Sequence, residues 1–274
     1  MDNPAAACDK IRTLLYDYVQ AYKLKALIIG ESGGVDSAVV TALAYPVCKN
    51  LGIRLVGRSI PIESNKEDER KRAYDISHAF CTSFKTTGQI EDVYNFYTKY
   101  KFRITDPIRR GNIKARMRMI YLYDLAYQEQ GLVLSTDNFT EYLLGFWTLH
   151  GDVGDLGMVQ ELWKSEVYDI ALWMCQEYFK EKEFDKADAL KACIDAKPTD
   201  GLGISDNDLD QIYPKWKEEC TDYRGGYSIV DNILNFYITQ SSTKWDTHPV
   251  VQRYKATMFK RSNPYNFKRA EIIN

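Results

Sequence analysis

Histidine is scarce in this chain of 274 residues, and its six cysteines are scattered. The three histidines stand at positions 78, 150 and 248, and no C-x-x-C pair occurs. Zinc sites and dithiol redox motifs need closely spaced ligands of these types. The sequence therefore argues against both.

Long apolar runs and an excess of one charge are missing too. No run approaches the roughly 20 apolar residues that a helix needs to span a bilayer. The 36 Lys and Arg residues nearly balance the 38 Asp and Glu residues, giving a net charge of -2, so no overall positive field favours nucleic acid. Because no signal peptide is visible, we expect a soluble cytoplasmic protein with reduced thiols, no membrane association and no nucleic-acid partner.

The alternation of predicted strands and helices indicates the fold class. Short apolar runs predict strands and periodic apolar positions predict helices, and the two alternate up to Ser135. This order is typical of a parallel sheet covered by helices, so we predict one doubly wound, Rossmann-like α/β domain over residues 1–274, mostly helical after Gly157. We expect strands at 26–29, 53–60, 83–87 and 132–135. Helices are expected at 5–22, 38–43, 65–80, 108–130, 162–180 and 184–196, with two more between 229 and 260. A glycine-rich loop is expected at 198–206.

A glycine-rich turn follows the first predicted strand. Residues 30–37 read Gly-Glu-Ser-Gly-Gly-Val-Asp-Ser. Such a turn aims backbone N–H groups and the positive end of a helix dipole at one point, and adjacent glycines let a phosphate approach. Bound phosphate would repel Asp36 unless a cation lay between them, which implies a hard metal such as Mg²⁺. The turn predicts a site for nucleotide phosphates and metal; the plainer alternative is an ordinary strand-to-helix turn.

This turn resembles the pyrophosphate loop of the ATP pyrophosphatases, which split ATP into AMP and pyrophosphate. It lacks the lysine of the Walker pattern and the three spaced glycines of the dinucleotide fingerprint. Further motifs follow: Gly-Asn-Ile-Lys-Ala-Arg-Met-Arg-Met at 111–119, Ser-Thr-Asp-Asn-Phe-Thr-Glu at 135–141, Gly-Asp at 151–152, Lys164, and Lys-Pro-Thr at 197–199. With these matches, the chain from about residue 25 to residue 261 strongly resembles the ammonia-dependent NAD synthetases.

The resemblance implies a reaction. That family makes NAD from nicotinic acid adenine dinucleotide (deamido-NAD), ATP and ammonia. The substrate carboxylate attacks the α-phosphate of ATP, pyrophosphate leaves, and ammonia then displaces AMP from the acyl-adenylate. No protein nucleophile is needed, so the catalytic work is positioning and the neutralisation of phosphate charge by Mg²⁺ and cationic side chains.

The resemblance also assigns residues to roles. Asp36 and Glu141 would bind the metal. Lys164 and Thr199 would reach the phosphates and, with Asp36 and Asp152, form the catalytic set. The ATP site would consist of Gly30, Ser32, Gly33, Gly34, Val35, Asp36, Ser37, Arg58, Thr136 and Lys164. The deamido-NAD site would consist of Asn112, Arg116, Tyr123, Asp152, Asp155 and Lys260.

Three departures from the family pattern stand out. One residue is missing before Asp155, Glu31 replaces an apolar residue, and Phe259 replaces a histidine, although Lys260 still matches. A carboxylate aimed at the ATP phosphates would weaken binding. We therefore expect the side chain of Glu31 to point away from them.

Ordinary structural roles are open for several of these residues. Arg116 and Arg118 could be solvated helix charges. Glu141 and Asp137 could be acids that complement a helix dipole, and for Asp137 this is the role we predict.

Other functions compete with NAD synthesis. The same loop occurs in the ATP-splitting domain of GMP synthetase, which carries a terminal dimerisation domain, and in tRNA-thiolating enzymes, which commonly bring cysteine pairs or an RNA-binding domain. A catalytically inactive nucleotide-binding module is the third alternative. The joint presence of Asp36, Glu141 and Lys164 argues against it, because binding without turnover does not need both metal carboxylates.

The nitrogen donor and the oligomeric state are also expectations. About 25 residues precede the loop, too few for a glutamine-hydrolysing domain, so we expect free ammonia as donor; a separate glutaminase subunit stays open. By family analogy the long helix at 108–130 predicts a homodimer surface, although the same face could be core. Its apolar residues are Ile113, Met117, Ile120, Tyr121 and Leu125.

Overall fold

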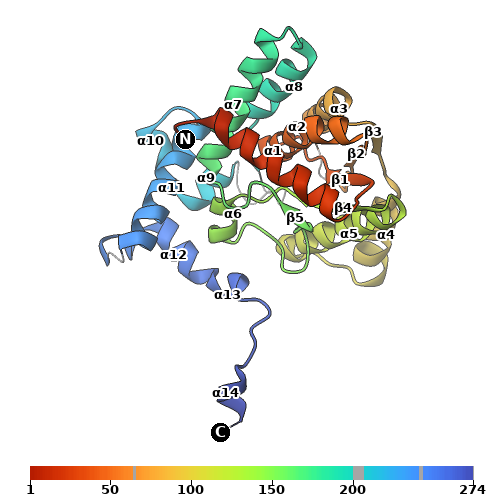
Figure 1. Ribbon diagram of the computed structural model, residues 1–274. Helices are drawn as coiled ribbons and strands as arrows, with labels where there is room; N and C mark the ends of the chain where they lie inside the picture. The colour runs from red at the N-terminus through yellow and green to blue at the C-terminus, as the bar shows by residue number, and fades with distance from the viewer. Residues whose placement is uncertain (64–65, 200–206, 241–242, 274) are drawn as a thin grey trace.

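The computed structural model describes residues 1–63, 66–199, 207–240 and 243–273. Figure 1 shows a central sheet of parallel strands, whose order is β3-β2-β1-β4-β5. Four of these strands were predicted; the two-residue β5 was not, because so short a strand carries no readable pattern. The strands are β1 (Ala26–Gly30), β2 (Arg54–Ser59), β3 (Ser83–Thr86), β4 (Gly131–Ser135) and β5 (Leu156–Gly157).

Helices flank the sheet and continue beyond it. The predicted helices are present with shifted ends. The short helices α4, α6, α9, α10, α13 and α14, the π-helical η1 and the 3-10 helix η2 were not predicted. Residue 65, an expected helix start, and residues 200–206 of the expected loop lie outside the described residues. The helices are α1 (Pro4–Ala21), α2 (Val35–Leu51), α3 (Glu67–Phe80), α4 (Gln89–Asn95), η1 (Phe96–Lys101), α5 (Pro107–Gln128), α6 (Phe139–Leu144), α7 (Lys164–Lys180), α8 (Phe184–Ile194), α9 (Asp208–Ile212), α10 (Trp216–Glu219), α11 (Tyr223–Gln240), η2 (Thr243–Trp245), α12 (Pro249–Ala256), α13 (Met258–Arg261) and α14 (Arg269–Ile272).

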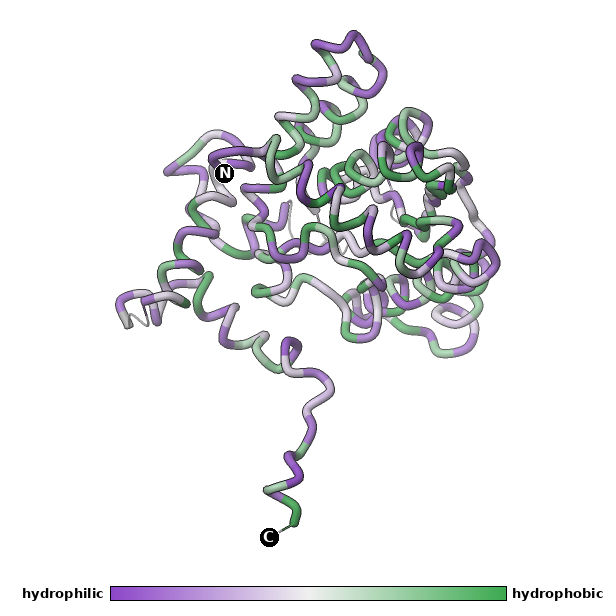
Figure 2. The backbone as a smooth tube through the Cα atoms, in the orientation of Figure 1, coloured by the Kyte–Doolittle hydropathy of each residue, from purple (hydrophilic) through white to green (hydrophobic). Residues whose placement is uncertain are grey.

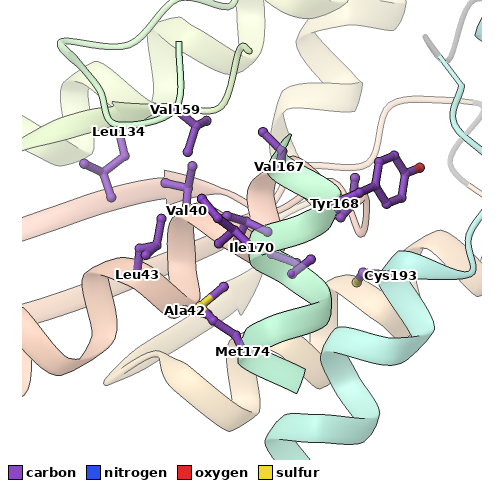
Figure 3. Close-up of a cluster of buried hydrophobic side chains, with 14 of the residues drawn as sticks. Val40, Ala42, Leu43, Leu134, Val159, Val167, Tyr168, Ile170, Met174 and Cys193 are labelled. Carbon is purple, nitrogen blue, oxygen red and sulfur yellow. The ribbon is translucent and has the colours of Figure 1, made fainter. Parts of the chain in front are cut away.

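Side chains of the central strands alternate between two buried clusters. Leu27 and Ile29 of β1 join the larger cluster, whereas Ile28 joins the smaller. The larger cluster lies against α1, α2, α7 and α8, and Figure 3 shows Leu134 of β4 and Ile170 of α7 within it. The smaller cluster lies against α5. Helices thus cover both faces, which confirms the predicted doubly wound α/β fold.

The order of the strands reverses beside β1. β2 and β3 extend the sheet on one side of it, and β4 and β5 on the other. Open parallel sheets bind ligands at the carboxyl ends of the strands next to such a switch point. The glycine-rich turn follows β1 and Thr136 follows β4, so both lie at this edge.

Two segments project from the body of the molecule. The α7–α8 hairpin ends in a turn that Figure 2 shows to be hydrophilic, and the chain after α13 leads away to α14 (Figure 1). In the part of the chain that the structure describes, no helix has both the length and the apolar content needed to cross a membrane.

Candidate active site

The glycine-rich turn has a backbone that only glycine fits at one position. Gly33 has a φ of +80°, and a Cβ there would lie 2.4 Å from the carbonyl oxygen of Glu69. Arg72 Nε donates a hydrogen bond of 2.8 Å to the carbonyl of Gly33, which fastens the turn to α3. A side chain at position 33 would therefore displace the turn from α3.

The hydroxyls of the turn lie close together at the start of α2. Ser32 Oγ and Ser37 Oγ are 3.1 Å apart, and the backbone N–H of Gly34 donates to Ser32 Oγ at 3.2 Å. Gly34 is the N-cap residue of α2, whose first turn includes Val35. Hydroxyls, a helix N-terminus and a tight turn form a cradle for an anion such as a phosphate.

Arg58 lies beside this cradle at the end of β2, paired in register with Gly30. The residue is 5% exposed, and its Nη1 donates to the carbonyl of Gly57 at 2.7 Å. Its buried Nε has no hydrogen-bond partner among the described residues. Such a donor is costly to leave unpaired, which suits a ligand that accepts from it.

Three helix N-termini bring together the two carboxylates that are predicted to bind metal and the lysine that is predicted to reach the phosphates. Asp36 lies in the first turn of α2, Glu141 in that of α6, and Lys164 begins α7. Lys164 Nζ donates to Asp36 Oδ2 and, at 2.8 Å, to Glu141 Oε1. Burial lowers the pKa of Lys164, but the two carboxylates outweigh this effect and hold it well above its ordinary value.

Positioning residues that sequence reasoning missed surround this cluster. Asn138 Nδ2 donates to Asp36 Oδ1 at 2.9 Å, and its Oδ1 accepts from the N–H of Glu141 at 3.0 Å. The backbone N–H of Lys164 donates to Thr140 Oγ1, whose hydroxyl donates to Asp231. Asn138 and Thr140 lie inside the 135–141 motif. For Asp231, the feature of the sequence that could have indicated its role is that it is the one carboxylate in the apolar helix α11.

The predicted deamido-NAD residues of α5 all contact the loop between α6 and β5. Arg116 Nη2 donates to the carbonyl of Leu149 at 2.9 Å, and Tyr123 donates to that of Val153 at 3.1 Å. Asn112 Oδ1 accepts from the Thr148 hydroxyl at 2.9 Å. All three side chains thus hydrogen-bond to the loop. Arg116 does so from an exposed position, and its substrate role stays a prediction.

The two predicted loop aspartates have different surroundings. Asp152 Oδ1 accepts from the backbone N–H of Thr148 at 2.7 Å, and burial raises its pKa. Asp155 Oδ2 accepts from the N–H of Val133 at 3.0 Å and so attaches the loop to the edge of β4. The structure thus gives Asp155 a structural contact, and its substrate role stays a prediction.

Lys260 reaches the same loop from α13. Its Nζ donates to the carbonyl of Gly145 at 2.6 Å and lies 5.6 Å from the ring centre of Trp147. Phe259, in the place of the family histidine, is 63% exposed. Thr199 is exposed and is the last described residue before residues 200–206.

We predicted that Asp137 complements the dipole of a helix, and the structure places it directly before the N-cap residue of α6 and not in the first turn. Asn138 is the N-cap residue of α6, and Asp137 precedes it and accepts from the Ser135 hydroxyl at 3.2 Å. Burial first, and then the carboxylates of Asp152, Glu141 and Asp36, raise its pKa well above the usual range. Asp137 therefore lies near enough to Asp152, Glu141 and Asp36 for their charges to act on it.

Glu31 turns into the protein interior. The Thr41 hydroxyl donates to its Oε1, and the residue is 4% exposed. Burial raises the pKa of Glu31 to about 8, against the smaller effects of the Thr41 and Ser37 hydroxyls. Its Oε1 is held by Thr41 in the second turn of α2, while Ser37 belongs also to the phosphate cradle, so the expectation that the side chain points away from bound phosphates stays a prediction.

Fold and site together define a nucleotide-binding α/β enzyme of the ATP pyrophosphatase type: a parallel sheet, an anion cradle after the first strand, and a carboxylate pair with a lysine beside it. Residues 7–270 match the family model of NAD synthase. The chain belongs to the NAD synthase family.

Similar proteins agree with this assignment. The chain is 32% identical over 264 residues to the NH3-dependent NAD+ synthetase of Wolinella succinogenes. The aligned region covers 92% of this chain and 97% of that protein. The fold is shared with the NMN synthetase from Francisella tularensis (TM-score 0.72, 24% identity, 95% of this chain and 94% of that one). It is also shared with the NH3-dependent NAD synthetase from Campylobacter jejuni (TM-score 0.69, 20% identity, 97% and 99%).

Proposed function

We propose that this protein forms NAD by amidating deamido-NAD with ammonia, with ATP as co-substrate and AMP and pyrophosphate as products. The observation that carries the proposal is the meeting of Asp36, Glu141 and Lys164 beside the anion cradle. Activation of a carboxylate by ATP needs positioned phosphates and neutralised charge, and this arrangement is suited to both.

In the proposed reaction the cradle binds the pyrophosphate of ATP. Ser32, Ser37 and the first N–H groups of α2 would donate to its oxygens, and Arg58 would approach the adenosine end. The substrate carboxylate attacks the α-phosphate and pyrophosphate leaves, which gives the acyl-adenylate; ammonia then attacks its carbonyl carbon and AMP leaves. Lys164 and Thr199 would contact the phosphates, whose charge increases at the leaving group.

We propose that Asp36 and Glu141 hold Mg²⁺ when ATP binds. Among the described residues, no group of three or more His, Cys, Asp or Glu side chains is arranged to hold a metal unaided. Mg²⁺ suits a pair of carboxylates, because it is usually bound by one or two of them together with substrate phosphates and water. Bound there, it would neutralise phosphate charge.

Asp152 and its surroundings are proposed to bind the nicotinate end of the substrate. Its carboxylate lies on the loop that Asn112, Arg116 and Tyr123 hold. Lys260 contacts the same loop and provides a positive charge for a substrate phosphate or carboxylate. Alternatives based on GMP synthesis or tRNA thiolation receive no support from the matched family.

We also propose a homodimer and a cytoplasmic location. Of the predicted dimer surface, Leu125 is buried in the smaller core cluster and Tyr121 packs against it, which corrects that part of the prediction. Ile120, Tyr123 and Tyr127 are 70%, 41% and 88% exposed on α5 and form an apolar stripe that can meet a second copy. All six cysteines are free thiols, as a reducing compartment requires.

A coupled assay tests the function. Purified protein is supplied with Mg²⁺, ATP, ammonium and deamido-NAD, and NAD is followed with alcohol dehydrogenase; glutamine replaces ammonium in a parallel reaction. Nicotinic acid mononucleotide serves as a second acceptor, with chromatography of its amide product, because the fold is shared with an NMN synthetase. NAD from ammonium supports the proposal, whereas amidation of the mononucleotide alone would reassign the substrate.

A further inference from the structure

The ammonium group of Lys164 occupies the position between the two proposed metal ligands, Asp36 and Glu141. Its ammonium group donates to both Asp36 and Glu141, and its side chain is 4% exposed against 16% and 21% for the two acids. One protein cation therefore pairs with both carboxylates and offsets one of their two negative charges. This inference rests on the proposed function, because the proposed metal ligands are the same two acids.

The lysine is held in this position from several sides. Its backbone N–H donates to Thr140 Oγ1 at 2.9 Å, and its Nζ lies 5.4 Å from the ring centre of Tyr227. Asn138 occupies the other oxygen of Asp36. The ammonium group thus has a carboxylate on either side and an aromatic face nearby, which is a complete environment for a buried cation.

A divalent metal entering this cluster alone would meet the ammonium at the same carboxylates. Two cations would then share two acids, and the displaced lysine would lose its partners inside the protein, which is costly. A metal that enters with ATP brings several phosphate charges with it. Those charges can receive the lysine when it leaves the carboxylates, since the phosphate cradle adjoins Asp36 at the start of α2.

We propose that Lys164 is an internal counter-ion of the metal carboxylates: it occupies Asp36 and Glu141 in the free enzyme and moves to the ATP phosphates when metal and nucleotide enter together. The free enzyme consequently has low affinity for metal alone. The lysine acts as a positioning residue before ATP binds and contacts the phosphates afterwards.

Binding of Mn²⁺ without nucleotide tests this, with the free ion measured by electron paramagnetic resonance. Mn²⁺ takes the same oxygen ligands as Mg²⁺. We expect Lys164→Met to bind one Mn²⁺ at least tenfold more tightly than the wild-type protein. The double variant Asp36→Asn/Lys164→Met should lose this gain.

Lys186→Met is the matched control. Lys186 is also a lysine paired with a glutamate and set against an aromatic ring, with Nζ 4.4 Å from the ring centre of Tyr45, but it lies on α8 away from the carboxylate pair. Its loss should leave Mn²⁺ binding at the wild-type level. An equal gain in this variant would attribute the effect to net charge and overturn the proposal.

Thermal unfolding provides a second measurement. In EDTA, Lys164→Met should unfold at a lower temperature than the wild type, because two neighbouring carboxylates lose their counter-ion, and Mg²⁺ alone should restore much of the loss. Wild-type protein should show little shift with Mg²⁺ alone. Tight binding of Mn²⁺ to the wild type without nucleotide would refute the proposal even if Lys164→Met did not fold. These readouts need no turnover, so failure of NAD synthesis would be seen separately.

Discussion

Asn138 holds the carboxylate of Asp36 through a hydrogen bond of 2.9 Å from Nδ2 to Oδ1. The same side chain caps α6, whose first turn carries Glu141. One amide thus sets the relative position of two acids that are far apart in the sequence. Outer partners of this kind decide how well a metal or phosphate site is aligned.

Asn138→Ser should separate the two roles of this residue. Serine can still cap α6 but is too short to reach Asp36, so we expect activity to fall about 10- to 100-fold with little loss of stability. Asn138→Ala should lose activity and also about 1 kcal/mol of stability. Steady-state NAD formation and urea unfolding measure the two effects. Asn207→Ser, at the cap of α9, is the control and should keep full activity.

Removal of either carboxylate that we propose as a metal ligand should strongly slow the reaction. We expect Asp36→Asn and Glu141→Gln to lower kcat about 100-fold or more, because charge on the transferring phosphate would no longer be balanced. Circular dichroism checks that the fold is retained. Asp169→Asn, which breaks an ion pair with Arg224, serves as the control. Near-normal turnover in both variants would remove the metal assignment.

Glu31 should make folding stability depend on pH. Its pKa is about 8 in the folded protein against an ordinary 4.5, so the folded state binds the additional proton between these values. Stability contributed by the protonated form is therefore lost as pH rises from about 4.5 to about 8, by at most roughly 1.4 kcal/mol per pH unit. Glu31→Gln should flatten this decline in urea unfolding measured at several pH values.

The exposed Glu181, in the turn between α7 and α8, provides the comparison. Glu181→Gln should follow the wild-type dependence on pH. Parallel curves for Glu31→Gln and the wild type would show that burial does not perturb the pKa of Glu31.

A charge on the apolar stripe of α5 should break the dimer. Ile120→Glu would place a carboxylate in a buried interface, where it has a high desolvation cost, so we expect a monomer by light scattering coupled to size-exclusion chromatography. Leu14→Glu on α1, at a residue that is 56% exposed, should remain dimeric. A wild-type protein that is already monomeric would exclude the stripe as an interface.

The sequence was most informative where a local pattern determines the structure. The apolar run of β1 and the glycines after it specify a strand and a turn that are visible within a few residues. The glycine-rich turn could therefore be placed directly after the first strand from the sequence alone.

Contacts between distant segments could not be foreseen in the same way. The bond from Asn138 to Asp36 depends on how α6 and α2 pack, and periodicity does not report that. Leu125 shows the converse limit, because an apolar face of a helix looks the same whether it meets the sheet or a second protein. Asp137, read as a helix acid, lies one residue too early to belong to α6.

Asp231 connects the C-terminal helices to the proposed active site although these helices lie outside the sheet. Its Oδ1 accepts from Thr140 at the start of α6, and its Oδ2 accepts from the N–H of Ser165 at the start of α7. The position of α7, which begins with Lys164, therefore depends partly on a residue of α11. For protein engineering this means that chimaeras with related enzymes should exchange residues 131–240 as one block, since a crossover between α7 and α11 would separate the lysine from the carboxylate that aligns its helix.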